Sequence, residues 1–168
     1  MEKARGVVWD LSGLYKNEDD PQINKDIKTA IQSAQSFKQK YYGKIAAESC
    51  DSDLLLQALL DYELLWEQGY RPFGMATLLF SANGKFDKYK AMVAQVQESV
   101  TKLSNETLFF ALEIQKIPEN KLNDFFANGK LNHYRHHIES LRLFTPYTLA
   151  ENEEQIINHK DLVRLVIL

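Results

Sequence analysis

The sequence predicts an all-α protein, an antiparallel helical bundle built from long helix hairpins. Apolar residues recur every three or four positions through most of the chain, which is the spacing of amphipathic helices. Only seven glycines and four prolines occur in 168 residues, and the prolines fall just inside expected helix starts or between helices. Period-two alternation is confined to the ends, GVVWDL and LVRLVIL, which are candidates for short extended pieces.

The first predicted helix begins after Asp20-Pro21, a capping residue followed by proline at the first helical position. Gly43 ends it. Its apolar positions share one face of the helix and are Ile23, Ile27, Ala30, Ala34, Phe37 and Tyr41.

A second helix is expected from a cap at Asp51 or Ser52. Its apolar positions are Leu55, Leu59, Tyr62 and Trp66. Gly69 together with Pro72 predicts a break or kink, after which the helix resumes in PFGMATLLFSANG.

The third helix carries the strongest pattern, a heptad seam without a breaker between Lys85 and Lys116. At 1.5 Å per residue such a helix is about 48 Å long. The seam is compatible with a core stripe inside the bundle or with a coiled coil to a second chain, and its aromatic residues favour the core. Its members are Phe86, Tyr89, Val93, Val96, Val100, Leu103, Thr107, Phe110, Ile114 and Ile117.

Shorter helices are expected in the last third of the chain. Pro118 ends the long helix and starts a short one, whose apolar residues are Leu122, Phe125 and Phe126. Gly129 separates it from a helix in LNHYRHHIESLRLF, and Pro146 precedes a final helix that begins near Glu151.

Composition excludes several classes of function. Hydrophobic residues make up 45% and charged residues 26%, as in ordinary globular proteins. The net charge of −3 and the lack of a Lys/Arg cluster argue against nucleic acid or anionic membrane as partners. No run approaches a membrane span. Cys50 is the only cysteine, so no internal disulfide is possible, and we expect a cytoplasmic protein.

No complete catalytic or metal site is visible in the sequence. The motifs of zinc peptidases (HExxH), nucleotide-binding loops and nucleophile elbows are absent. His133 and His137 stand four positions apart and can share a helix face, but no third metal ligand is marked. Cys50 lies among the carboxylates of Glu48, Asp51 and Asp53, which disfavour a thiolate. We therefore predict no catalytic and no metal-binding residues in this chain.

Several segments together resemble the start of the oligoendopeptidase F family of zinc metallopeptidases. They are WDLSGLY (9–15), KQKYYGKI (38–45), LLQALLDYELLWEQGYRPFGMATLLFSAN (55–83), VQESVTKLSNETLFFALEIQKIPENKL (96–122) and HYRHHIESLRLFTPYTLAENEEQII (133–157). The similarity runs in order from about Trp9 to Asn158, which is nearly the whole chain.

The resemblance implies that residues 1–168 form a single helical domain like the non-catalytic N-terminal domain of that family. In the family this lobe walls one side of a deep groove that admits short, unstructured peptides. The zinc and its HExxH helix belong to a larger domain that follows, where a zinc-polarised water attacks the peptide bond. The chain alone is therefore expected to be inactive and to hold no cofactor.

The end of the chain departs from the family pattern. Residues 159–168 form a divergent apolar tail, HKDLVRLVIL, where the family continues toward its catalytic domain. A boundary chosen for expression, a truncated gene or a change of reading frame would each produce such an end. The apolar run either folds back onto the bundle or pairs with a second copy of the chain, and we expect the homodimer, because loss of a partner domain exposes an apolar face.

Two other functions compete with a peptidase lobe. One is a free-standing helical module that binds another helix or a peptide through the seam or through the aromatic surface near Tyr134 and Tyr147. The other is a small metal protein built on His133 and His137. Candidate residues for the substrate groove are the polar and aromatic ones that crowd one expected bundle end, namely His133, Tyr134, Arg135, His136 and Tyr147.

Overall fold

The computed structural model describes the backbone of residues 10–166 and the side chains of residues 10–160, and regular structure in this part of the chain is entirely helical. The all-α prediction is confirmed. The elements are α1 (Pro21–Tyr41), α2 (Ser52–Ala82), α3 (Asp87–Lys116), α4 (Glu119–Ala127), the 3₁₀ turn η1 (Asn132–Tyr134), α5 (Arg135–Leu143), the 3₁₀ turn η2 (Thr145–Tyr147) and α6 (Glu151–Val166).

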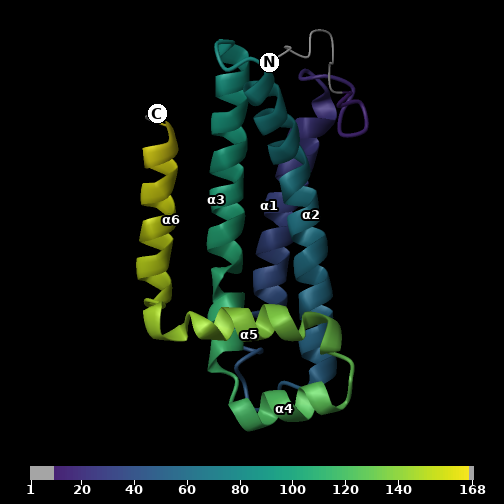
Figure 1. The fold of residues 1–168 in the computed structure, drawn as a ribbon, viewed down its shortest axis with the longest axis vertical. Helices are drawn as coiled ribbons and strands as arrows, with labels where there is room; N and C mark the ends of the chain where they lie inside the picture. Colours follow the sequence, from purple (N-terminus) through teal and green to yellow (C-terminus); the bar gives the residue numbers. More distant parts are fainter. Residues whose placement is uncertain (1–9, 167–168) are drawn as a thin grey trace, which may run out of the picture.

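The three long helices form the body of the molecule. α1, α2 and α3 pack pairwise along the long axis (Figure 1). α4 and α5 cross the lower end of this bundle, and α6 runs beside α3 (Figure 1). No helix within residues 10–166 is both long and apolar enough to cross a membrane.

Both predicted N-terminal caps are present. The side chain of Asp20 accepts a hydrogen bond from the backbone N–H of Gln22, and Pro21 opens α1. Asp51, and not Ser52, caps α2 by accepting from the N–H of Leu54. Just beyond α1, Gly43 has a φ of 74°, a conformation in which glycine avoids the strain of a side chain.

Of the break or kink predicted at Gly69 and Pro72, the break is wrong, because α2 continues through both residues to Ala82. Pro72 has no N–H, so the carbonyl of Gln68 loses its usual helical hydrogen bond. The inward face of α2 is nevertheless buried on either side of this point, at Leu65, Gly69, Pro72 and Ala76. Packing of that face holds the helix together where local sequence favours a break.

The ends of the chain differ from the expectation of extended pieces. α6 includes residues 162–166, so the extended interpretation of LVRLVIL is wrong as far as Val166. Most of GVVWDL lies outside the described residues.

The seam of α3 packs inside the bundle, as the core interpretation predicts. The buried members are Val96, Leu103, Thr107, Phe110, Ile114 and Ile117. Phe86 precedes the helix and is 44% exposed. The core forms two clusters along the bundle, a larger one that reaches α4 and α5, and a smaller one around Met75 and Val96.

The three long helices pack closely around a glycine of α2. A methyl group on Gly69 would overlap Cδ2 of Leu103 in α3 and would lie 4.0 Å from the Cβ of Ala30 in α1. Gly69 and Ala30 are both buried, so small side chains permit this approach. A side chain at residue 69 would therefore force the buried Leu103 to shift.

A buried carboxylate holds the connection between α1 and α2. Glu113 of α3 is 7% exposed and accepts three backbone hydrogen bonds, from Gly43 (2.6 Å), Ile45 (2.8 Å) and Ala46 (3.2 Å). The turn after α1 has no regular helical partners for these N–H groups, and the carboxylate supplies them.

Cationic side chains attach the lower helices to neighbouring backbone. Lys121 of α4 donates to the carbonyls of Ala47 (3.2 Å) and Glu48 (2.7 Å). Arg142 of α5 donates to the carbonyl of Ile117 at the end of α3 (2.5 Å). These bonds fix α4 and α5 across the end of the bundle.

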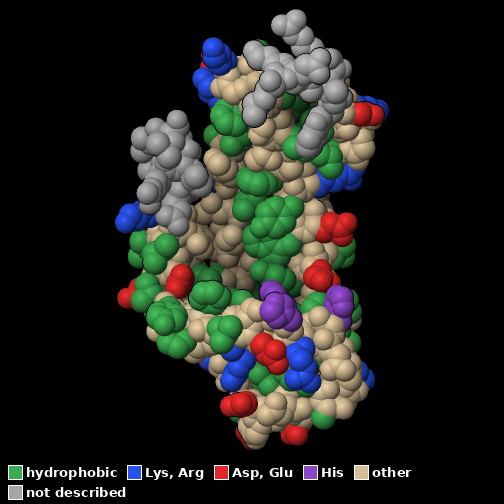
Figure 2. Space-filling model, in the orientation of Figure 1, with side chains coloured by type: hydrophobic (Ala, Val, Ile, Leu, Met, Phe, Trp, Pro, Cys, Tyr) green, Lys and Arg blue, Asp and Glu red, His purple; other side chains and the backbone are tan. Residues whose placement is uncertain are grey.

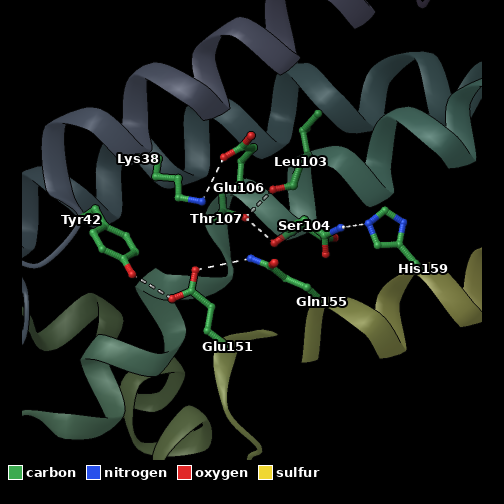
Figure 3. A network of polar contacts seen from close by, with 10 residues as sticks. Lys38, Tyr42, Leu103, Ser104, Glu106, Thr107, Glu151, Gln155 and His159 are labelled. Atoms are coloured by element: carbon green, nitrogen blue, oxygen red, sulfur yellow. Dashed lines mark hydrogen bonds and ion pairs between the residues drawn. The ribbon is translucent and has the colours of Figure 1, made fainter. Parts of the chain in front are cut away.

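α6 is attached to the bundle by polar contacts, which Figure 3 shows from close by. Asn158 donates to Asn105 of α3 (2.9 Å), and the Nδ2 of Asn105 lies 3.0 Å from the Nε2 of His159. At the start of α6, Glu151 accepts from the hydroxyl of Tyr42 (3.2 Å). None of the described side chains of α6 is buried, so this helix lies outside the core.

The contact at Gly69 yields a test of the helix packing. We expect G69A to lower the free energy of unfolding, because overpacking typically costs about 1–3 kcal/mol. The helix propensity gained by replacing glycine with alanine is only about 0.5–1 kcal/mol. Gly74, in the same helix, has no atom within 4 Å of where a methyl group would lie, so G74A is the matched control. Urea unfolding should show G74A stabilised by about 0.5–1 kcal/mol and G69A destabilised, and stabilisation of both would contradict this packing.

The carboxylate of Glu113 yields a second test. E113Q keeps the shape of the side chain but places an NH₂ group against backbone N–H donors, so we expect the free energy of unfolding to fall by about 1–3 kcal/mol. E106Q is the control, because Glu106 of α3 pairs with Lys38 at 3.3 Å and both side chains are about one third exposed to solvent. Such a pair is worth under about 1 kcal/mol. Equal losses of unfolding free energy in the two variants would show that the three backbone hydrogen bonds of Glu113 stabilise the fold no more than a partly exposed ion pair does.

Candidate functional site

A groove lies between α2 and the η1–α5 segment and has a volume of about 650 Å³. We call it the histidine groove. Its lining residues from α2 are Leu59, Tyr62, Glu63, Trp66 and Glu67, and those from η1 and α5 are His133, Tyr134, His136 and His137. Figure 2 shows histidine side chains at the lower end of a run of hydrophobic side chains on this face of the molecule.

The spacing of buried residues explains why the histidines face the groove. Leu131, Tyr134 and Ile138 are buried, and their spacing of three and four places them on one face of the η1–α5 segment. His133, His136 and His137 fall between these positions and are exposed. The core contacts of three residues thus turn the three imidazoles outward.

The same argument applies to the opposite wall. Leu65 and Gly69 face the core, so Glu63 and Glu67, which stand one helical turn apart, are exposed on another face of α2. Trp66 lies between the two faces and is partly buried against the core. This wall of the groove is therefore formed by the polar and aromatic residues of α2 that lie beside its buried face.

One hydrogen bond links the two walls. The hydroxyl of Tyr134 donates to Oε2 of Glu63 at 2.5 Å. Two causes raise the pKa of Tyr134 to about 12: mainly the burial of the ring, and to a lesser extent the neighbouring Glu63 carboxylate. The phenol therefore stays protonated near neutral pH, where it positions η1 against α2 and does not serve as a base.

Aromatic rings continue from the groove along α2. The rings of Tyr62 and Trp66 lie 6.1 Å apart, and those of Trp66 and Tyr70 lie 5.1 Å apart at an angle of 32°. Tyr70 is 52% exposed. The Nε1 of Trp66 is buried without a hydrogen-bond acceptor among the described residues. The α2 wall thus offers an aromatic surface next to two carboxylates.

The five candidate residues for the groove do not all lie together. His133, Tyr134 and His136 line the histidine groove. Arg135 lies outside it, with its guanidinium carbon 4.1 Å from the ring centre of Phe126 in α4 and an ion pair to Glu139 at 3.5 Å. Tyr147, in η2, is 80% exposed and also lies outside it.

Sequence reasoning missed the α2 wall of the groove. The signal was present in DYELLWEQGY, where aromatic residues recur every four positions at 62, 66 and 70 and glutamates at 63 and 67. This repeat places an aromatic stripe beside an acidic one on a single helix.

The described residues do not fit a zinc ion. Within residues 10–160, no group of three or more histidine, cysteine, aspartate or glutamate side chains is placed to hold a metal. His133 and His137 line the same groove without a third ligand placed beside them.

Cys50 is a core residue. It is 3% exposed, and burial raises the pKa of its thiol, so the thiol stays protonated near neutral pH. Its Sγ lies 3.6 Å from the carbonyl oxygen of Asp51. Neither its burial nor its charge state suits a nucleophile.

A second cavity, of about 540 Å³, lies between the turn after α1, the end of α3 and the η2–α6 junction. Tyr42, Phe109 and Leu149 contribute apolar surface, and the carboxylate of Glu113 is already engaged by the backbone bonds described above. This cavity belongs to the junction that seats α6.

Comparisons with known proteins find a similarity over part of this chain. No curated protein sequence and no solved structure matches it. One family model does match, described as oligopeptidase F and covering an N-terminal domain, over residues 113–165. The matched segment begins at Glu113 and includes α4, η1, α5 and nearly all of α6. The chain is therefore similar to the oligopeptidase F family over residues 113–165, which is less than half of its length.

Proposed function

We propose that this chain serves as the non-catalytic N-terminal domain of an oligoendopeptidase F-like zinc metallopeptidase, with the histidine groove as part of the wall that receives short peptides. The observation that carries this proposal is the family match, since it contains the histidines and Tyr134 of the groove. The opposite wall, on α2, belongs to the same compact bundle.

The groove has the chemistry that peptide binding requires. Its volume of about 650 Å³ lies within the range of ligand sites, roughly 300–1,000 Å³. Aromatic rings supply apolar contact area, while imidazole and carboxylate groups supply hydrogen-bonding partners for peptide amides. An open groove with this lining accepts an extended segment more readily than a folded protein.

We propose that this chain contributes by binding the peptide substrate and orienting it. In the parent family a zinc ion supplies the chemistry by activating water, and its HExxH motif does not occur in this sequence. We further propose a cytoplasmic location, which a single buried cysteine suits. Besides peptides, the proposed binding partner of this chain is the catalytic domain or a second copy of the chain.

A second candidate function is a free-standing helical interaction module. Large apolar side chains that cluster in residues 143–157 favour it, because they offer a surface for another protein. They are Leu143, Phe144, Tyr147, Leu149, Ile156 and Ile157, exposed by 38–80%. Tight binding to one folded partner, with no affinity for short peptides, would favour this module over the peptidase lobe.

The peptidase-lobe proposal predicts that the chain alone is inactive. Incubated with added zinc and a fluorogenic short peptide, the purified chain should release no fluorescence above buffer. A known zinc peptidase provides the positive control. Cleavage that a chelator abolishes would place the catalytic chemistry in this chain and overturn the assignment.

The proposal also predicts where a short peptide binds. We expect W66A to weaken binding of a fluorescein-labelled unstructured peptide by about fivefold or more, because loss of an aromatic anchor typically costs more than about 1 kcal/mol. Y147A, which removes an exposed aromatic ring outside the groove, is the matched control and should leave the affinity unchanged. Fluorescence anisotropy measures both, and circular dichroism checks that each variant keeps its helical content. A loss in Y147A without a loss in W66A would place the peptide elsewhere.

A further inference from the structure

The histidine groove carries two carboxylates that the described part of the chain does not neutralise. Glu63 and Glu67 stand one turn apart on α2, a spacing at which like charges repel. Glu63 accepts a hydrogen bond from the uncharged hydroxyl of Tyr134. Among the described residues neither carboxylate forms an ion pair with a lysine, arginine or histidine side chain.

The neighbouring cations are engaged elsewhere. Arg71 donates to the carbonyl of Leu14 (2.8 Å) and lies over the ring of Tyr15. Arg135 packs on Phe126 and pairs with Glu139. Lys130 pairs with Asp53. The acidic wall of the groove is therefore open to a cation from outside the chain.

Aromatic rings stand beside these carboxylates. Trp66 immediately precedes Glu67 in the sequence and lines the groove with Tyr62. The faces of tryptophan and tyrosine attract cations, and an adjacent carboxylate strengthens that attraction. The stem of a lysine or arginine side chain packs on such rings while its charged end reaches the carboxylate.

We propose that the histidine groove binds the cationic side chain of an arginine or lysine in a peptide, with its charge at Glu67 and its stem against Trp66 and Tyr62. This inference rests on the proposed peptide-binding function and names the class of peptide. Glu63, held by Tyr134, contributes a second negative charge, and His133 and His136 form the opposite wall. The volume of the groove accommodates the side chain together with a short stretch of backbone.

The test compares two labelled peptides that differ in one residue, arginine or the uncharged isostere citrulline. The full chain should bind the arginine peptide roughly twofold to fivefold more tightly, the effect of one exposed cation–π and carboxylate contact. E67Q should abolish this preference while leaving the affinity for the citrulline peptide unchanged. Glu67 is exposed, so the substitution leaves the core intact.

E98Q is the matched control. Glu98 is an exposed glutamate of α3 outside the groove, paired with Lys102, so its substitution should preserve the preference for arginine. Equal affinity of the two peptides, both weakened by W66A, would overturn the cationic specificity and leave the peptide-binding groove standing. Absence of binding by either peptide would overturn the peptide-binding function itself. Loss of the preference for arginine in E98Q as well as in E67Q would overturn the assignment to Glu67. It would mean that the preference arises from the net charge of the protein and not from a contact with Glu67.

Discussion

The close contact between Gly69 of α2 and Leu103 of α3 is the constraint on which the rest of this structure depends. It allows α1, α2 and α3 to approach along a shared face, and burial of that face carries α2 through Pro72 without interruption. Once the inward face of α2 is fixed, helical periodicity determines which residues lie on its outer edge. The groove wall of Trp66, Glu63 and Glu67 follows from this packing.

The other wall depends on how the end of the bundle is closed. Glu113 holds the turn after α1 against α3, while Lys121 and Arg142 attach α4 and α5 to neighbouring backbone. The bond between Tyr134 and Glu63 then joins the two walls. α6, attached by polar contacts and without a buried described side chain, adds little to this arrangement.

Local sequence determined the helices and their caps, and these were predictable. Asp20 and the seam of α3 act through neighbours in the sequence, so the sequence pattern alone identified them. The pattern narrowed the cap of α2 to Asp51 or Ser52, and the structure shows that it is Asp51. The continuity of α2 at Pro72 was not predictable, because it arises from tertiary packing. The histidines of the groove stood out as a polar and aromatic cluster. Their partners on α2 did not, since Glu63 meets Tyr134 across 71 positions of sequence.

The central claim is that the histidine groove is the peptide-binding surface of this domain. Nuclear magnetic resonance of the ¹⁵N-labelled chain, titrated with a short arginine-containing peptide, tests it most directly, because the indole N–H of Trp66 gives a resolved signal of its own. The account predicts shifts at that indole and at the backbone amides of residues 133–137. Shifts confined to η2 and α6 would contradict it.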